Sequence, residues 1–220
     1  MDTKKFKKLV DALPESPNIL AKERYYNSAV LVPFIKKDDG LHLLFQKRSA
    51  NIRQGSEICF PGGMFDKTSD KNYYETAVRE TVEELGITPE KIDVKGRLDT
   101  LVASIGATVD SFVACLNIND LEELSINTDE VEKVFMVPVQ EFLDNPPDEY
   151  NVRLEVQPSY INKNGEKVTL LPSEELGLPE IYHKPWGGLN HRVLVYKTGF
   201  GIIWGITAEI IYEIVNKIQK

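Results

Sequence analysis

Hydrophobic and polar positions alternate along the chain in a pattern that predicts a mixed α/β protein. Residues 28–35 and 41–47 are rich in β-forming side chains, and the turn residues between them predict a hairpin with a loop of about five residues. Pro33 lies inside the first of these strands and cannot donate a backbone hydrogen bond, so we expect an edge position or a bulge there. Further strands are expected near residues 92–101, 109–116, 131–137, 192–197 and 200–204.

Residues 72–85 show the clearest helical period in the chain. Gly86 follows this segment as a residue suited to the end of a helix. Shorter helices are expected over residues 3–13, at the periphery, and from Pro138 to Leu143, and a last helix over about 207–218. The apolar stripe of the 72–85 helix consists of Tyr74, Ala77, Val78, Val82 and Leu85.

The chain shows no clear linker and no repeat, so we expect a single domain over residues 1–220. Residues 1–25 are expected to form an N-terminal helical extension, and residues 145–190 a variable insertion or loop region. Within that region, residues 150–158 and 167–171 predict a hairpin, and residues 172–190 predict a long loop because they are rich in Pro and Gly.

Composition and charge narrow the class of protein. Lys and Arg total 26 against 34 Asp and Glu, and the net charge of −8 argues against a nucleic-acid-binding protein. No apolar run approaches the roughly 18 residues of a membrane helix, and the N-terminus lacks the apolar stretch of a secretory signal. The two cysteines, Cys59 and Cys115, cannot form a disulfide framework and are expected in the core. We therefore expect a cytoplasmic protein with neither a membrane nor a nucleic-acid partner.

Three carboxylates on the 72–85 helix carry the candidate chemistry. Glu80, Glu83 and Glu84 have the spacing of one helix face, opposite the apolar stripe, and such a face is often merely solvated. Arg79 lies one turn before Glu83 and can pair with it. Additional oxygen donors, Asp66 and Asp70, lie in the preceding loop. Clustered carboxylates are what Mg²⁺ requires, and Mg²⁺ is usually shared with substrate phosphates, so the residues suggest metal-assisted phosphoryl chemistry.

The segment from Arg79 to Ile87, Arg-Glu-Thr-Val-Glu-Glu-Leu-Gly-Ile, resembles the Nudix box, Gx5Ex7REUxEExGU, in which U is apolar. Thr81 departs from the box at an apolar position. Lys71 and Phe65 stand where the box has its first Glu and its first Gly, so the loop before this helix is longer than in the standard box.

That longer loop is similar to the one in the coenzyme A pyrophosphatase branch of the Nudix family. The branch has Phe-Pro-Gly-Gly and later aspartates, and this chain has the same features from Phe60 to Asp70, followed by Thr76-Ala77-Val78-Arg79-Glu80. Upstream, Arg48-Ser49 and Arg53 resemble the branch signature LLTxRSx3Rx3Gx3FPGG. The stretch after Arg53 is one residue shorter than in the signature, and Gly55 is displaced.

The resemblance implies an α/β/α sandwich with a mixed sheet and an enzyme that hydrolyses a pyrophosphate bond with Mg²⁺ or Mn²⁺. The expected metal ligands are Glu80, Glu83, Glu84 and the backbone carbonyl of Gly63, and Arg79 is expected to position Glu83. The expected substrate is coenzyme A or acyl-CoA, and the expected products are 3′,5′-ADP and 4′-phosphopantetheine or its acyl form. ADP-ribose, dinucleoside polyphosphates and oxidised nucleotides are alternative substrates. A non-catalytic nucleotide-binding module and a homodimer are further expectations left open.

The remaining site residues have two interpretations each. The general base is either Glu83 or Glu130, and Glu130 is otherwise an exposed acidic loop residue. Arg48 and Arg53 are candidate partners for substrate phosphates, together with the backbone of Gly62 and Gly63, because Arg makes charge-assisted and often bidentate contacts with phosphate. The alternative for both arginines is a solvated loop cation.

Overall fold

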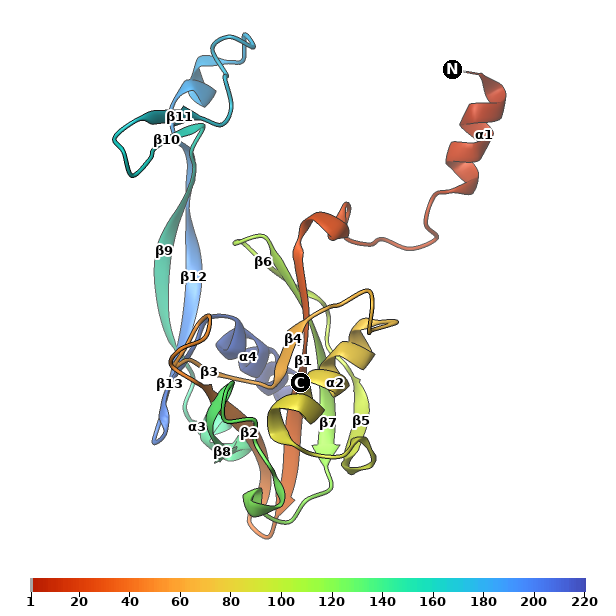
Figure 1. Ribbon diagram of the computed structural model, residues 1–220, viewed down its shortest axis with the longest axis vertical. Helices are drawn as coiled ribbons and strands as arrows, with labels where there is room; N and C mark the ends of the chain where they lie inside the picture. Colours follow the sequence, from red (N-terminus) through yellow and green to blue (C-terminus); the bar gives the residue numbers. More distant parts are fainter. Residues whose placement is uncertain (1) are drawn as a thin grey trace.

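An eight-stranded mixed sheet forms the body of the protein in the computed structural model, which describes residues 2–220 (Figure 1). Its main path runs β3-β2-β1-β7-β5, while β4 pairs with β1, β6 with β7 and β8 with β2. The strands are β1 (Tyr26–Lys37), β2 (Gly40–Arg48), β3 (Ile58–Cys59), β4 (Gly62–Met64), β5 (Ile92–Arg97), β6 (Leu101–Ala103), β7 (Ala107–Leu116) and β8 (Val131–Pro138).

The hairpin of β1 and β2 is tighter than its sequence predicts. The two strands stay in register as far as Lys37 and Gly40, so the turn consists of Asp38 and Asp39 alone. The expected loop of about five residues is therefore wrong. Lys36 and Lys37 continue the strand because their backbone groups pair with β2, whatever the polarity of their side chains.

Pro33 lies in the interior of the sheet, not at its edge, because β1 is flanked by β7 on one side and by β2 and β4 on the other. β4 pairs with β1 as far as Val30, and β2 pairs with it only from Phe34 onward. The amide of Leu31 donates to the Pro61 carbonyl (2.9 Å), on the side of β4. Since strand amides alternate sides, the nitrogen of Pro33 faces the same side, in the gap between the two partners, and no ladder hydrogen bond is lost.

Helices cover both faces of the sheet and confirm the α/β/α sandwich. Alternate residues of β1 point to opposite faces: Leu31 packs in a cluster with Leu85 of α2 (Tyr73–Leu85), and Val32 packs in a cluster with Phe142 and Ile211. The latter two belong to α3 (Val139–Asp144) and α4 (Gly205–Gln219). The expected helices over 72–85 and 207–218 are thus present, with slightly different ends.

The N-terminal helix lies apart from the body. It is α1 (Thr3–Asp11), none of whose residues is buried, and it stands clear of the sheet in Figure 1. The short 3₁₀ turn η1 (Lys22–Arg24) leads from it into β1; two similar turns, η2 (Pro89–Lys91) and η3 (Leu121–Glu123), lie in later loops. The expected peripheral helix is confirmed.

A two-stranded arm extends from the body and corrects the predicted pairing of residues 145–190 (Figure 1). β9 (Asp148–Val156) pairs with β12 (Trp186–Thr198), not with residues 167–171, and the predicted long loop ends where β12 begins. The pattern of alternation marks strands but does not identify partners distant in sequence. The arm ends in β10 (Ser159–Ile161), β11 (Lys167–Thr169) and η4 (Glu180–His183), and at the body β12 pairs with β13 (Gly201–Trp204).

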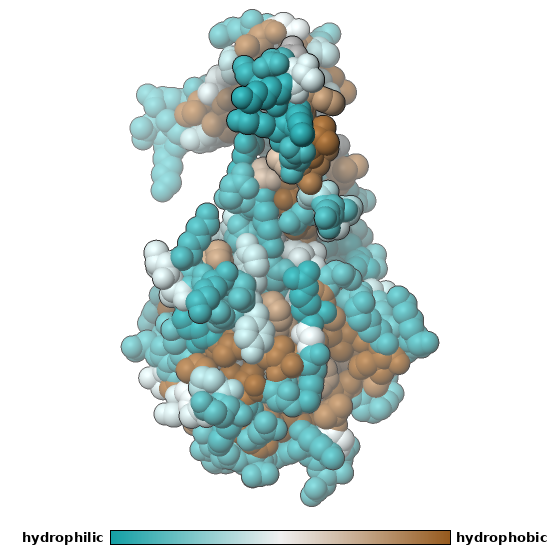
Figure 2. Space-filling view, turned by 90° about the vertical axis from the view of Figure 1, so that its right-hand side faces the viewer, coloured by the Kyte–Doolittle hydropathy of each residue, from teal (hydrophilic) through white to brown (hydrophobic). Residues whose placement is uncertain are grey.

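The arm contributes little to the core. The two buried apolar clusters contain no residue from 146–193, and polar and apolar residues mix on the surface of the narrow upper part of the molecule (Figure 2). Among residues 2–220, no helix is long and apolar enough to cross a membrane.

Candidate active site

The carboxylate helix α2 is fixed at both ends by local contacts. Asn72 accepts a hydrogen bond from the Glu75 amide (3.0 Å), and the Glu75 carboxylate accepts one from the Lys71 amide (2.9 Å), which satisfies free amides of the first turn. Gly86 ends the helix in the left-handed conformation, at φ 62°. The helix therefore has defined ends, and its side chains have a defined rotation relative to the sheet.

That rotation differs from the one the apolar stripe predicts. Tyr74 is 46% exposed, whereas Thr76, Thr81 and Glu84 are buried beside Ala77 and Leu85. The side chains of Glu84, Glu80 and Glu83 are 2%, 16% and 56% exposed, so the three carboxylates run from the protein interior to the solvent. The expectation of one carboxylate face opposite the buried face is wrong, because polar partners from the β3–β4 segment and β2 draw Glu84 inward.

Glu84 is a buried carboxylate with few partners. Its Oε2 accepts a hydrogen bond from the Gly62 amide (2.9 Å), and Arg48 Nη1 lies 3.8 Å from its Oε1. Burial raises the pKa of Glu84 to about 7, and the Gly62 amide and the Arg48 charge only partly oppose this effect. A cation beside this carboxylate favours its ionised form and offsets the cost of burial.

Glu80 rests directly on the backbone of Gly63. A Cβ atom on Gly63 would lie 2.3 Å from the Glu80 carboxyl carbon, so only glycine leaves room for this carboxylate. Gly62 has φ +153°, and a Cβ there would lie 2.4 Å from the Ala29 carbonyl oxygen. Burial raises the pKa of Glu80, and Arg79 opposes that effect. The Gly62-Gly63 pair therefore forms a cradle for two carboxylates, one on its amide and one on its surface.

Arg79 joins the helix to the preceding loop. Its Nε and Nη2 donate to the two oxygens of Asp70 (2.8 and 3.0 Å), and its Nη1 lies 2.9 Å from Glu80 and 3.1 Å from Glu83. The hydrogen bonds from Arg79 lower the pKa of Asp70 to about 2. The expected contact between Arg79 and Glu83 is present, and sequence reasoning missed the stronger partner, Asp70.

Asp66 and Asp70 are not spare oxygen donors, contrary to the expectation. Asp70 is buried and also accepts a hydrogen bond from Thr76 (2.9 Å). Asp66 accepts hydrogen bonds from its neighbours Thr68 and Ser69, which close a turn. Both carboxylates therefore shape the loop before α2.

The two candidate phosphate-binding arginines lie at the entrance to the same site. Arg48, at the end of β2, lies beside Glu84 and donates to the Arg53 carbonyl oxygen (3.3 Å). The Arg53 guanidinium is exposed and lies 5.0 Å from the centre of the Tyr26 ring. The loop around Arg53 is tight, since Gln54 and Ser56 both take the left-handed conformation on either side of Gly55.

Glu130 lies within electrostatic range of the carboxylate cluster. It is exposed, its amide side of the chain leads into β8, and its backbone carbonyl accepts a hydrogen bond from the Ser49 amide (2.9 Å). Burial is the main cause of the raised pKa of Glu80, and the negative charge of Glu130 adds to it. Glu130 and Glu83 are both exposed enough to meet a substrate, and the geometry of the chain alone does not choose between them as base.

The arrangement fits a hard divalent cation that is shared with a substrate. Within residues 2–220, no three acidic, histidine or cysteine side chains are grouped closely enough to hold a metal ion by themselves. Mg²⁺ commonly takes one or two carboxylates and completes its shell with water and phosphate oxygens. Glu80 and Glu84, buried and poorly compensated, supply that number of oxygen ligands, and the more exposed Glu83 lies beside them.

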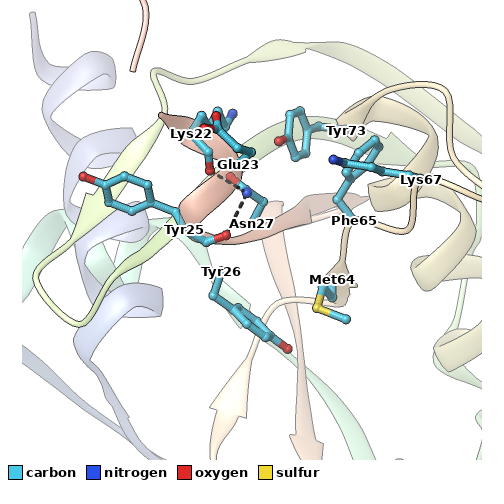
Figure 3. A pocket seen from close by; sticks show the side chains of 9 residues that line it. All are labelled: Lys22, Glu23, Tyr25, Tyr26, Asn27, Met64, Phe65, Lys67 and Tyr73. Carbon is cyan, nitrogen blue, oxygen red and sulfur yellow. Dashed lines mark hydrogen bonds between the residues drawn. The ribbon is translucent and has the colours of Figure 1, made fainter. Parts of the chain in front are cut away.

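A hollow next to the carboxylates contains residues that sequence reasoning missed. It has a volume of about 320 Å³ and opens where β1 begins and β4 ends (Figure 3). No sequence signal marks it, because its walls come from segments that are distant along the chain. Its lining includes Lys22, Tyr26, Met64, Phe65, Lys67 and Tyr73.

Comparison with known proteins gives a family match over this region. The family model of the NUDIX domain matches residues 25–157, which is more than half of the chain and contains all the carboxylates and arginines described above. The chain is 32% identical over 208 residues to the uncharacterized Nudix hydrolase NudL of Photorhabdus laumondii, covering 94% of this chain and 92% of that protein.

Other similar proteins match over shorter ranges. The chain is 38% identical over 116 residues to the peroxisomal coenzyme A diphosphatase NUDT7 of Mus musculus, covering 52% of this chain and 48% of that protein. Across such curated relatives the chain spans from about half to nearly all of their length. A solved structure, the Ap4A hydrolase of Caenorhabditis elegans in a binary complex, superposes on 53% of this chain and 83% of that one, with a TM-score of 0.44 and 22% identity.

Proposed function

The chain belongs to the NUDIX domain family, and from this premise we propose that it is a metal-dependent pyrophosphohydrolase whose substrate is coenzyme A or acyl-CoA. Hydrolysis of the pyrophosphate bond gives 3′,5′-ADP and 4′-phosphopantetheine or its acyl form. Water supplies the oxygen that replaces the bridging oxygen at one phosphorus, and the other phosphate leaves.

One observation carries the proposal: two carboxylates, Glu80 and Glu84, are buried on the Gly62-Gly63 backbone with too little positive charge around them. Buried carboxylates without full compensation are costly to the fold, so their presence favours a functional role. A divalent cation compensates this charge and also attracts a diphosphate.

The residues of the chain divide the work as follows. Glu80 and Glu84, with Glu83 and the Gly63 carbonyl, would hold Mg²⁺ or Mn²⁺, which when bound neutralises the diphosphate and acidifies water. Arg79, tied to Asp70, keeps Glu80 and Glu83 in place and so acts as a positioning residue. Glu83 or Glu130 accepts the proton of the attacking water. Arg48 and Arg53 pair with phosphate oxygens at the entrance.

Two observations favour a coenzyme A compound. The mouse relative is a coenzyme A diphosphatase, and it is similar to this chain over residues of the catalytic region's length. The arginines of the upstream signature, Arg48 and Arg53, lie together at the carboxylates, where a ligand with more than two phosphate groups meets additional positive charge.

A second candidate is a Nudix hydrolase with another nucleoside diphosphate derivative as its substrate. The observation that favours it is the shortened and tightly turned segment from Gln54 to Ser56, which departs from the coenzyme A signature. ADP-ribose, dinucleoside polyphosphates and oxidised nucleotides belong to this candidate. The presence of Glu80, Glu83 and Glu84 together argues against a module that only binds nucleotides.

The test of the proposal is hydrolysis of a substrate panel with Mg²⁺ or Mn²⁺, resolved by chromatography. The panel consists of coenzyme A, dephospho-coenzyme A, ADP-ribose, a diadenosine polyphosphate and an oxidised deoxynucleoside triphosphate. We expect coenzyme A to be the preferred compound, with 3′,5′-ADP as a product. Preference for another compound would move the chain to the second candidate, and no turnover of any compound would contradict the enzymatic role.

Variants of α2 test the site independently of the substrate. Glu83→Gln and Glu84→Gln remove a negative charge without changing side-chain volume, and we expect each to lower kcat by roughly 100-fold or more while the circular dichroism spectrum stays unchanged. The control is Glu90→Gln, an exposed carboxylate just beyond α2, which we expect to be fully active. Activity close to that of the control in both variants would contradict the proposed role of the helix.

A further inference from the structure

The hollow at the start of β1 adjoins the carboxylates through a single strand. Gly63 carries Glu80 on its surface, and the next residues, Met64 and Phe65, line the hollow. Phe65 is held there by a hydrogen bond from its amide to the Asn27 carbonyl oxygen (3.0 Å). A ligand whose diphosphate lies at the carboxylates therefore places its neighbouring group beside this hollow.

Aromatic rings form much of its wall. Tyr26 is 45% exposed, and the rings of Phe65 and Tyr73 pack with their centres 4.7 Å apart. Figure 3 shows these rings and Met64 on different sides of the opening. An exposed aromatic ring at the entrance to a nucleotide-hydrolysing site offers a face on which a base can stack.

The charges around the hollow are unequal. Lys22 is compensated, because its Nζ lies 2.7 Å from Asp110 and 3.9 Å from the centre of the Tyr73 ring. Lys67 is exposed, and within residues 2–220 no ion pair involves it. Glu23 is also at the rim and is exposed to solvent. Lys67 is thus the lining cation with its charge available to a ligand.

The volume sets a limit on the ligand. About 320 Å³ is near the lower end of the range for small-molecule sites, which suits a single ring system and excludes an entire coenzyme. We propose that this hollow binds the aromatic base of the substrate's nucleotide half, and that Lys67 pairs with a phosphate on the ribose of that nucleotide. This inference rests on the proposed function, since the substrate must be a nucleoside diphosphate derivative.

The hollow recognises the ring by stacking more than by its hydrogen-bonding edge. The polar side chain inside it, Asn27, is already in use: its amide nitrogen donates to the carbonyls of Lys22 and Tyr25 (2.9 and 2.8 Å), and its oxygen accepts from Thr108 (2.6 Å). A base therefore gains contact area from Tyr26 and Met64 without displacing these bonds. Discrimination between purine bases is expected to be weak.

Calorimetric titration with a product-like ligand tests the inference without turnover. The probes are adenosine 3′,5′-bisphosphate and adenosine 5′-monophosphate, both without added metal. We expect Tyr26→Leu to weaken binding of both probes about tenfold, because it removes the stacking face. We expect Lys67→Ala to weaken the bisphosphate about fivefold and to leave the monophosphate unchanged.

Matched variants separate these effects from general ones. Tyr150→Leu removes a tyrosine of similar exposure (52%) on the arm, and Lys71→Ala removes a lysine from the same loop as Lys67 but outside the hollow's lining. Both are expected to bind the probes as the unsubstituted chain does. The bisphosphate is also expected to inhibit hydrolysis competitively.

The outcomes distinguish this inference from the proposed function. If the chain hydrolyses coenzyme A but Tyr26→Leu and Lys67→Ala bind the bisphosphate normally, the inference is overturned and the proposed function stands. Inhibition that does not compete with substrate overturns it as well, since the nucleotide then binds elsewhere. Absence of any bisphosphate binding by the unsubstituted chain also overturns it, whatever the substrate panel shows.

Discussion

At the scale of single residues, two glycines decide where the negative charge of the site lies. Gly63 leaves room for the Glu80 carboxylate, and Gly62 offers its amide to Glu84. Both carboxylates are held where burial raises the pKa. The chain therefore stores unfavourable charge at this point, as functional sites commonly do.

Gly63→Ala tests this cradle. The added Cβ would lie 2.3 Å from the carboxyl carbon of Glu80, so the carboxylate must move away from the backbone. We expect kcat to fall by roughly 100-fold while the protein stays folded, since misplacement of a catalytic group by about 1 Å has effects of this size. Gly96→Ala is the control, because nothing lies within 4 Å of a Cβ built on that strand residue. Equal activity of the two variants would show that the cradle has no role.

Asp70→Asn tests the contact between the loop and Arg79. The pKa of Asp70 falls from 3.8 to about 2 in the folded chain, so its ionised form stabilises the fold at neutral pH. That contribution is complete above the unfolded pKa and disappears as the pH falls from about 4 to about 2. We expect the variant to lose about 2 kcal/mol of unfolding free energy at pH 7, measured by urea denaturation.

The difference between Asp70→Asn and the unsubstituted chain should shrink below about pH 4, because both then carry a neutral side chain. Asp129→Asn, an exposed residue of the loop before β8, serves as the control and should match the unsubstituted chain at every pH. A loss of stability in Asp70→Asn that is constant from pH 7 to pH 3 would rule out the ionised carboxylate as its cause.

At the scale of elements, the arm of β9 and β12 is separate from the core that holds the site. Val156 and Trp186 are direct partners at the far end of the ribbon, and residues 157–185 form a tip beyond them. Neither buried apolar cluster contains a residue of that tip. A ribbon of two strands gains little stability alone, so the arm depends on its attachment at β13 and the body.

Replacing residues 157–185 with Asn-Gly tests this separation. Asn-Gly suits the tight two-residue turn that joins paired strands, and here it would connect Val156 to Trp186 directly. We expect the melting temperature to change by no more than about 3 °C, because no core contact is lost. Loss of a cooperative unfolding transition in circular dichroism would show that the tip is part of the folding unit.

At the scale of the whole molecule, one strand organises both faces of the sandwich and the site. β1 packs α2 on one face and α3 and α4 on the other, and it pairs with β4, whose glycines hold the carboxylates. The site is therefore formed only in the folded state. A cation bound there must stabilise the folded chain against the unfolded one.

Mg²⁺ should raise the melting temperature of the unsubstituted chain. At about 100 times its dissociation constant, linkage gives roughly 2.7 kcal/mol, which corresponds to about 5–10 °C for a chain of this size. The measurement is differential scanning fluorimetry across a Mg²⁺ titration, with Na⁺ at matched ionic strength as the control. Glu84→Gln should lose most of the rise. The same rise in that variant would place the bound ion elsewhere.

The sequence by itself determined the features that depend on neighbours along the chain. The period and capping residues of 72–85 predicted α2, and the resemblance from Arg79 to Ile87 predicted the family, because a helix is set by contacts within a few residues. The glutamates, Gly63 and the entrance arginines were also predicted, and the structure brings them together.

Only the tertiary structure decided what depends on distant partners. The pairing of β9 with β12, the interior place of Pro33, the burial of Glu84 and the bond between Asp70 and Arg79 all join segments that local pattern cannot match. The hollow beside Tyr26 belongs to the same class, since its walls meet only when β1 and β4 pair. Strand partners, helix rotation and side-chain burial are fixed by long-range packing, which the order of residues expresses only through the fold.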